Sequence, residues 1–256
     1  IFRKEQIFFR WYGKSYRKVL NTFTHLFVQD EASVQLLRTI GITNTTVVGD
    51  TRFDRVLEIC HQAKELPLVE KFKGNHTAFV AGSSWGPDED IFIPYLNAHP
   101  EVKLIIAPHV IDESHLKEII GKLNRTVVRY TQATEEKVKE ADCLLIDCFG
   151  LLSSIYRYGE VAYIGGGFGV GIHNVLEAAV YGMPVIFGPN NKRFREAQGL
   201  LQCKGGFEIQ GAEDFKKIMD NFLNNYEALD KAGKKAGNYV RDNAGALEKI
   251  MHTVTL

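Results

Sequence analysis

Short apolar segments alternate along the chain with longer stretches in which apolar residues recur at helical spacing. Segments rich in β-branched and aromatic residues predict strands at 25–29, 45–49, 78–82, 103–107, 126–130, 143–147, 161–164 and 184–187. Most of the intervening segments, and the last 45 residues, have helical spacing, which predicts helices at 31–40, 88–98, 112–123, 151–158, 174–181, 212–223, 226–243 and 246–251. Regular strand–helix–strand alternation favours an α/β fold with a parallel sheet covered by helices on both faces.

A change in composition suggests a domain boundary after the second predicted strand. Residues 57–76 are punctuated by Lys, Glu, Pro and Gly before the apolar segment that begins at Ala78. We therefore expect 1–56 to form the end of one α/β unit, 57–76 to be a linker, and 77–256 to form a complete Rossmann-like domain.

Overall composition excludes several classes of protein. Lysine and arginine together number 31, as do aspartate and glutamate, so no net charge points to nucleic acid as a partner. The four cysteines form no CxxC pair and no metal-like cluster, and we interpret them as buried reduced thiols. The apolar stretch 161–188 is interrupted by glycines and Pro184, which argues against a transmembrane helix.

The first 20 residues are locally basic and aromatic. Arg3, Lys4, Arg10, Lys14, Arg17 and Lys18 are interleaved with Phe, Trp and Tyr, and Glu5 is the single acidic residue there. Such a segment is compatible with contact to an anionic membrane surface. The alternative, which we favour, is a helix of a larger domain that exposes a basic face to solvent.

The most informative loop runs from Gly165 to Glu177 and reads GGGFGVGIHNVLE. Glycines directly after a strand let backbone N–H groups approach a phosphate, and the following helix offers further donors. Asn174 has the character of an N-cap residue, and Glu177 follows at the capping-box spacing. The glycines do not fit G-x-G-x-x-G in any register, which disfavours a dinucleotide-dependent dehydrogenase.

Ligands of an open parallel sheet bind beyond the carboxyl ends of its strands, which directs attention to three further loops. Small and hydroxyl side chains follow the strand at 78–82, and Asp88–Asp90 come next. Those carboxylates resemble a D-x-D metal motif, although stabilisation of the first turn of a helix explains them as well. His109 follows the next strand as a candidate for phosphate or base contact, and Phe149 is either a ligand contact or a core aromatic.

Arg52 lies after the strand predicted at 45–49, in a segment we expect to be a loop. Its guanidinium could stabilise anionic charge on a ligand. An ion pair with Asp50 or Asp54 is the structural alternative, and the sequence leaves both open.

Taken in order, these segments resemble the Kdo (3-deoxy-D-manno-octulosonic acid) transferases of lipopolysaccharide and lipid A biosynthesis. The matching segments are 27–30, 36–41, 49–55 (GDTRFDR), 81–84, 105–109 (IIAPH), 147–150, 165–177 and 182–196 (GMPVIFGPNNKRFRE). They span essentially the whole chain and correspond to the C-terminal portion of the family.

The resemblance implies a GT-B glycosyltransferase with two Rossmann domains and an active site in the cleft between them. Residues 1–56 would end the N-terminal acceptor domain, and 77–256 would be the C-terminal nucleotide-sugar (donor) domain. The implied reaction moves Kdo from CMP-Kdo to a lipid A precursor (lipid IVA) at the cytoplasmic face of the bacterial inner membrane. It inverts the anomeric centre and needs no metal or other cofactor.

The family's general base is a glutamate in a glycine-rich loop near the start of the first domain, and we find no counterpart here. We therefore expect a fragment that lacks the catalytic base and transfers no sugar by itself. Membrane contact would come through the N-terminal half that precedes this segment in the family.

The resemblance also assigns roles to individual residues. Arg52 would stabilise the departing CMP and is the one catalytic residue it implies here. His109 stands where the family has an arginine beside Pro108, and Leu151 stands where it has an acidic residue. The implied substrate-binding residues are Gly82, Ser83, Ser84, Pro108, His109, Phe149, Gly150, Leu151, Gly167, His173, Asn174, Val175, Leu176 and Glu177.

Two other interpretations remain open. Other GT-B enzymes that use a UDP-sugar, and UDP-GlcNAc epimerases, also place a carboxylate on the helix after a glycine-rich loop. A non-catalytic nucleotide-binding module would likewise keep the donor site without a catalytic base.

Overall fold

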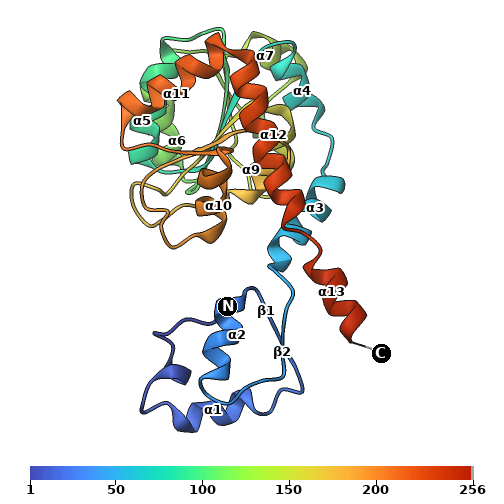
Figure 1. Cartoon of the computed structure of the whole chain (residues 1–256). Helices are drawn as coiled ribbons and strands as arrows, with labels where there is room; N and C mark the ends of the chain where they lie inside the picture. The colour runs from blue at the N-terminus through green and yellow to red at the C-terminus, as the bar shows by residue number, and fades with distance from the viewer. Residues whose placement is uncertain (255–256) are drawn as a thin grey trace. The chain divides into compact units, whose positions relative to one another are not determined.

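The computed structural model describes residues 1–254, which fall into two compact units. Unit 1 comprises Ile1–Arg55 and Asp242–Leu256, and unit 2 comprises Val56–Arg241. The chain passes from unit 1 to unit 2 within helix α3 (Thr51–His61) and returns at the end of helix α12 (Tyr226–Asp242) (Figure 1).

Unit 1 is built around a small parallel sheet of β1 (Leu26–Val28) and β2 (Thr45–Val47). Its core contains Leu20, Val28, Val34, Leu37 and Ile42, which come from α1, α2, β1 and the turn after α2. The other elements are η1 (Ile7–Phe9), α1 (Lys14–Leu20), α2 (Glu31–Arg38) and α13 (Ala246–Thr253).

Asp54 explains why residues from 242 onward belong to unit 1. Its carboxylate accepts hydrogen bonds from the backbone N–H groups of Gly245 (2.7 Å) and Ala246 (3.2 Å), at the start of α13. This division differs from the predicted boundary, which placed the whole C-terminal segment in the second domain. The bonds span about 190 positions in sequence, so no local pattern reports them.

Unit 2 contains a seven-stranded parallel sheet in the order β5-β6-β4-β3-β7-β8-β9. Every neighbouring pair is parallel, so the predicted α/β class with a parallel sheet is confirmed. The strands are β3 (Ala78–Ser84), β4 (Lys103–Pro108), β5 (Val127–Arg129), β6 (Cys143–Leu145), β7 (Val161–Ile164), β8 (Val185–Phe187) and β9 (Gly206–Glu208). The chain builds outward from β3 through β4 and then crosses to β7, which makes the neighbourhood of β3 the switch point of the topology.

Helices cover both faces of this sheet (Figure 1). On one face α5, α6 and α11 bury Phe92, Ile119 and Phe215 in the main core, while α4 and α7 pack against each other elsewhere. The helices not yet located are α4 (Pro67–Lys73), α5 (Gly86–Asn97), α6 (Glu113–Lys122), α7 (Glu135–Glu140), α8 (Leu152–Ile155), α9 (Leu176–Ala179), α10 (Arg195–Cys203) and α11 (Ala212–Asn224). The one-turn 3-10 helices are η2 (Tyr130–Gln132) and η3 (Tyr156–Tyr158).

The segment predicted as a linker is largely helical and belongs to unit 2. Residues 57–76 contain the C-terminal end of α3 and all of α4, in which Val69 and Phe72 are fully buried. The backbone N–H of Leu66 also donates to the hydroxyl of Tyr158 at 2.8 Å. The composition of this segment is dominated by the charged residues on the exposed face of α4, so composition alone did not indicate its buried apolar face.

No helix among residues 1–254 is both long enough and apolar enough to span a membrane. The basic segment at the N-terminus forms η1 and α1, and Trp11, Tyr12 and Tyr16 beside them are exposed. Its contact with a membrane stays a prediction.

Candidate functional site

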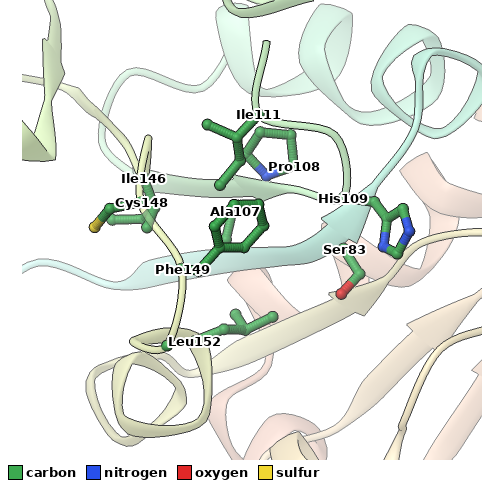
Figure 2. A pocket seen from close by; sticks show the side chains of 10 residues that line it. Ser83, Ala107, Pro108, His109, Ile111, Ile146, Cys148, Phe149 and Leu152 are labelled. Carbon is green, nitrogen blue, oxygen red and sulfur yellow. The ribbon is translucent and has the colours of Figure 1, made fainter.

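A cavity of about 210 Å³ opens at the carboxyl ends of β3, β4 and β6, close to the switch point of the sheet. Figure 2 shows Ser83 and His109 at one end of it, and Ile146 and Cys148 at the other. Its lining residues are Ser83, Ala107, Pro108, His109, Ile111, Ile146, Cys148, Phe149, Gly150 and Leu152. Five of the predicted binding residues therefore meet here, namely Ser83, Pro108, His109, Phe149 and Gly150.

Ser83 lies in a strained backbone conformation at the mouth of this cavity. Its φ of +51° is left-handed, which costs a residue with a Cβ roughly 1–2 kcal/mol. The pairing register of β3 with β4 shifts between Gly82 and Ser84, so the strand bulges at Ser83. Strain of this kind clusters at functional sites, where the surrounding structure maintains it.

Gly82 has no side chain, and the Tyr156 side chain fills the space that a Cβ would occupy. A Cβ at this position would lie 1.8 Å from the hydroxyl oxygen of Tyr156, which is 1% exposed. Glycine therefore lets the Tyr156 side chain pack directly against β3. The prediction that Gly82 contacts the ligand remains a prediction.

Asp88 and Glu89 lie in the first turn of α5, as the helix alternative predicted, but both are buried, whereas Asp90 is exposed. Glu89 is fully buried, and it accepts a hydrogen bond from the Ser84 hydroxyl at 2.9 Å. Its other oxygen pairs with Nε2 of His115 at 3.0 Å. The hydroxyl of Ser84, predicted to contact the ligand, is thus bonded inside the protein, because the bulge at Ser83 changes the face to which Ser84 belongs.

Asp88 ties three segments together, and the sequence alone did not reveal this role. Its carboxylate accepts hydrogen bonds from the backbone N–H groups of Trp85 (3.0 Å) and Gly166 (2.9 Å) and from the hydroxyl of Tyr163 (2.8 Å). Burial raises the pKa of Asp88, while these bonds act in the opposite direction. The N3 position of Asp88 after Trp85 is the one local signal that could have suggested part of this arrangement.

The glycine-rich loop packs against the protein more closely than the sequence predicted. A Cβ at Gly165 would lie 2.2 Å from the carbonyl oxygen of Ser83, and one at Gly167 would lie 2.5 Å from the backbone nitrogen of Gly188. The backbone N–H groups of 165, 166, 169, 171 and 173 all donate within the protein. These five groups are therefore engaged within the protein, and contact of the loop with a phosphate stays a prediction.

The capping arrangement predicted for Asn174 and Glu177 forms only in part. The helix has a single turn, Leu176–Ala179, with Val175 at its N-cap. The Asn174 side chain accepts from the Leu176 N–H at 3.2 Å and donates to Glu177 Oε1 at 2.9 Å. Burial raises the pKa of Glu177, and the bond from Asn174 opposes that shift. A helix this short has little dipole, so it offers a phosphate less than we predicted.

Two aromatic features define the surface of the site. Phe149 is 80% exposed and lines the cavity, so the alternative that it is a core residue is wrong. The rings of Trp85 and His173 each stack against the exposed ring of His109. Three different loops are joined by this stack.

Arg52 belongs to unit 1 and lies in the first turn of α3, not in a loop as predicted. Its guanidinium pairs with Asp50 through Nε (2.9 Å) and Nη2 (2.8 Å). Burial by itself would raise the pKa of Asp50, but the hydrogen bonds and charge of Arg52 lower it overall. The structural alternative for Arg52 is therefore present, and its catalytic role stays a prediction.

Comparison with known proteins supplies the decisive observation. The chain is 25% identical over 248 residues to the 3-deoxy-D-manno-octulosonic acid transferase of Rickettsia bellii, covering 94% of this chain and 59% of that protein. It is 28% identical over 218 residues to the transferase of the same name from Aquifex aeolicus, covering 82% of this chain and 57% of that protein. The chain is a homologue of the 3-deoxy-D-manno-octulosonic acid transferases. No family model matches it.

The chain spans between half and three fifths of the length of these Kdo transferases. Among solved structures it resembles the C-terminal CMP-Kdo binding domain of WaaA from Acinetobacter baumannii, with a TM-score of 0.59 and 21% identity. That likeness covers 74% of this chain and 97% of that domain. The predicted GT-B type of fold is therefore confirmed.

Proposed function

We propose that this chain is the part of a Kdo transferase that binds the donor CMP-Kdo. The proposal rests on one observation: the segments that resemble Kdo transferases lie together around a single cavity. Segments 81–84, 105–109 and 147–150, which carry the resemblance, converge on one cavity at the switch point of the sheet. The homologous proteins are named 3-deoxy-D-manno-octulosonic acid transferases.

The chemistry of the cavity suits the nucleotide half of such a donor. Pro108, Ile111 and Phe149 offer apolar surface for a planar base, and Ser83 offers a hydroxyl group at the same mouth. Glu177 does not line this cavity, and it is half-buried, with one oxygen accepting a hydrogen bond from Asn174. A carboxylate held in this way can accept hydrogen bonds from ribose or base, and charge-assisted bonds are the stronger kind.

The rest of the reaction is proposed from the homology. Kdo would pass to a lipid A precursor such as lipid IVA, with inversion and without a metal, at the cytoplasmic face of the bacterial inner membrane. The acceptor and the membrane surface would be engaged by the part of the relatives that this chain does not match. Arg52 would stabilise the departing CMP.

Calorimetry with CMP, UMP and UDP on the purified chain tests the donor assignment. We expect CMP to bind more tightly than UMP or UDP, because the similar domain of WaaA is named for binding CMP-Kdo. Saturation at about 100 times the Kd should also stabilise the fold by roughly 2.7 kcal/mol in thermal unfolding. Tighter binding of UDP would transfer the chain to the GT-B enzymes that use UDP-sugars.

Loss of the cavity surface gives a second test. Phe149→Ala removes an exposed ring that packs against little else, so CMP affinity should fall while the melting temperature stays unchanged. Tyr226→Ala, which truncates another ring that is 78% exposed, is the matched control and should affect neither quantity.

A further inference from the structure

Trp85 makes two separate contacts within the ring stack at the site. Its indole lies on the His109 ring, with centroids 4.6 Å apart and planes 25° from parallel. The His173 ring also stacks against the His109 ring, with centroids 4.4 Å apart and planes 28° from parallel. The indole N–H of Trp85 also donates to Nε2 of His173 at 3.2 Å.

The bond from Trp85 fixes the protonation state of His173. Nε2 can accept from the indole only when it carries no proton, so the proton of a neutral ring must be on Nδ1. Burial and the neighbouring His109 lower the pKa of His173, which keeps the ring neutral at pH 7. No hydrogen bond of the described residues involves Nδ1, so its N–H remains available to an outside acceptor.

The backbone holds both partners in place before any ligand arrives. Asp88 Oδ2 accepts from the backbone N–H of Trp85 at 3.0 Å and from that of Gly166 at 2.9 Å. The loop that carries His173 is closed by a hydrogen bond from the backbone N–H of His173 to the carbonyl oxygen of Gly165. One buried carboxylate therefore fixes both the tryptophan and the loop of the histidine.

We infer that Trp85 is a positioning residue of the donor site, which holds His173 as the neutral Nδ1–H tautomer and so presents a hydrogen-bond donor to an anionic oxygen of the ligand. The inference rests on the proposed function, and it adds a residue that the resemblance did not assign. The ligand chemistry is the phosphate or carboxylate oxygen of a nucleotide-linked acidic sugar. A neutral donor here would recognise such an oxygen without a fixed cation at the end of β4.

The experiment combines ring-nitrogen NMR with CMP titration of the 256-residue chain. Long-range ¹⁵N–¹H correlation spectra at pH 7.5 should show His173 protonated on Nδ1, with the signals assigned through a His173→Gln variant. Trp85→Phe keeps a ring for the stack but lacks the indole N–H. We expect the Nε2–H form to become populated and CMP affinity to fall roughly three- to tenfold, the effect of one hydrogen bond.

Trp11→Phe is the matched control, because it is the same change at the chain's other tryptophan, which is 87% exposed in unit 1. It should leave both the His173 signals and CMP affinity unchanged. A wild-type His173 protonated on Nε2, or a Trp85→Phe variant with unaltered tautomer and affinity, would overturn the inference. A wild-type chain that shows the Nδ1–H tautomer yet binds no CMP would keep the role of Trp85 in the tautomer and overturn the proposed function.

Discussion

The carboxylate of Asp88 accepts a hydrogen bond from the backbone N–H of Gly166 at 2.9 Å, across 78 positions of sequence. The same side chain holds the hydroxyl of Tyr163, so the start of α5, strand β7 and the glycine-rich loop share one buried anchor. The shape of the candidate site therefore depends on a residue that does not line the cavity.

Replacing Asp88 by Asn should destabilise the fold by about 1–3 kcal/mol. The amide has only one accepting oxygen, so at least one buried donor loses its partner. Urea unfolding measures the change, and Asp90→Asn two residues later is the control. Asp90 is exposed and pairs with Lys122, so its loss should cost less than about 1 kcal/mol. Equal effects of the two substitutions would contradict the anchoring role.

Gly82→Ala should cost about 1–3 kcal/mol, because the added methyl group would overlap the Tyr156 hydroxyl in a filled core. In a Tyr156→Phe background the cost should be smaller, and a double-mutant cycle by chemical denaturation measures that difference. Gly169→Ala is the control, since a Cβ at Gly169 meets nothing within 4 Å. An unchanged cost in the Phe background would show that the hydroxyl is not the obstacle.

Because His115 is paired with Glu89, we expect the free energy of unfolding to fall as the pH rises above about 6.5. Burial opposes a charged His115, but its bonds to the Val110 carbonyl and to Glu89 raise its pKa overall, and burial raises the pKa of Glu89. The folded pair keeps a proton that the unfolded chain has lost above pH 6.5, so folding takes up a proton there. The slope is at most about 1.4 kcal/mol per pH unit for one proton.

Urea unfolding between pH 6 and 8.5 tests this prediction against His115→Gln, which can still donate to Glu89 but cannot titrate. The stability difference between wild type and variant should shrink as pH rises. A difference that is constant with pH would show that the pair carries no extra proton in the folded state.

Glu177→Gln should weaken CMP binding about tenfold and leave the melting temperature nearly unchanged. The Gln oxygen can still accept from Asn174, but the charge that strengthens a bond to ligand is lost. Calorimetry and thermal unfolding measure the two effects separately. Glu213→Gln on the exposed face of α11 is the control. Reduced stability with unchanged affinity would assign Glu177 to structure alone.

Arg52→Ala should lower the stability of this chain by less than about 1 kcal/mol, since the Arg52 side chain is 53% exposed and its pair with Asp50 is screened by water. In a full-length transferase that contains this chain, we expect kcat for Kdo transfer to fall about 10²–10³-fold, as for loss of a group that stabilises developing charge. Near-normal transfer would leave Arg52 with the ion pair as its only role.

The sequence by itself determined the parallel α/β architecture, because most strands and helices of unit 2 have their own apolar period, although β9, α4 and α10 were not predicted. Elements at 103–107, 161–164 and 212–223 form almost where that period predicts them. Ligands of a parallel sheet bind beyond the carboxyl ends of its strands, and this rule identified the loops after β3, β4 and β6 as neighbours. The cavity lined by Ser83, Pro108, His109, Phe149 and Gly150 lies where these loops meet.

Tertiary structure alone decided which polar groups line the cavity and which became buried. Asp88 and Glu89 lie in the first turn of a helix, as predicted, yet they are buried and have partners in Tyr163, Gly166 and His115. Trp85 reaches His173 across 88 positions. Such contacts depend on sheet order and on the bulge at Ser83, and no periodicity along the chain records them. Local patterns fix the direction of side chains within an element, whereas the partner that each one meets is set by how the elements pack.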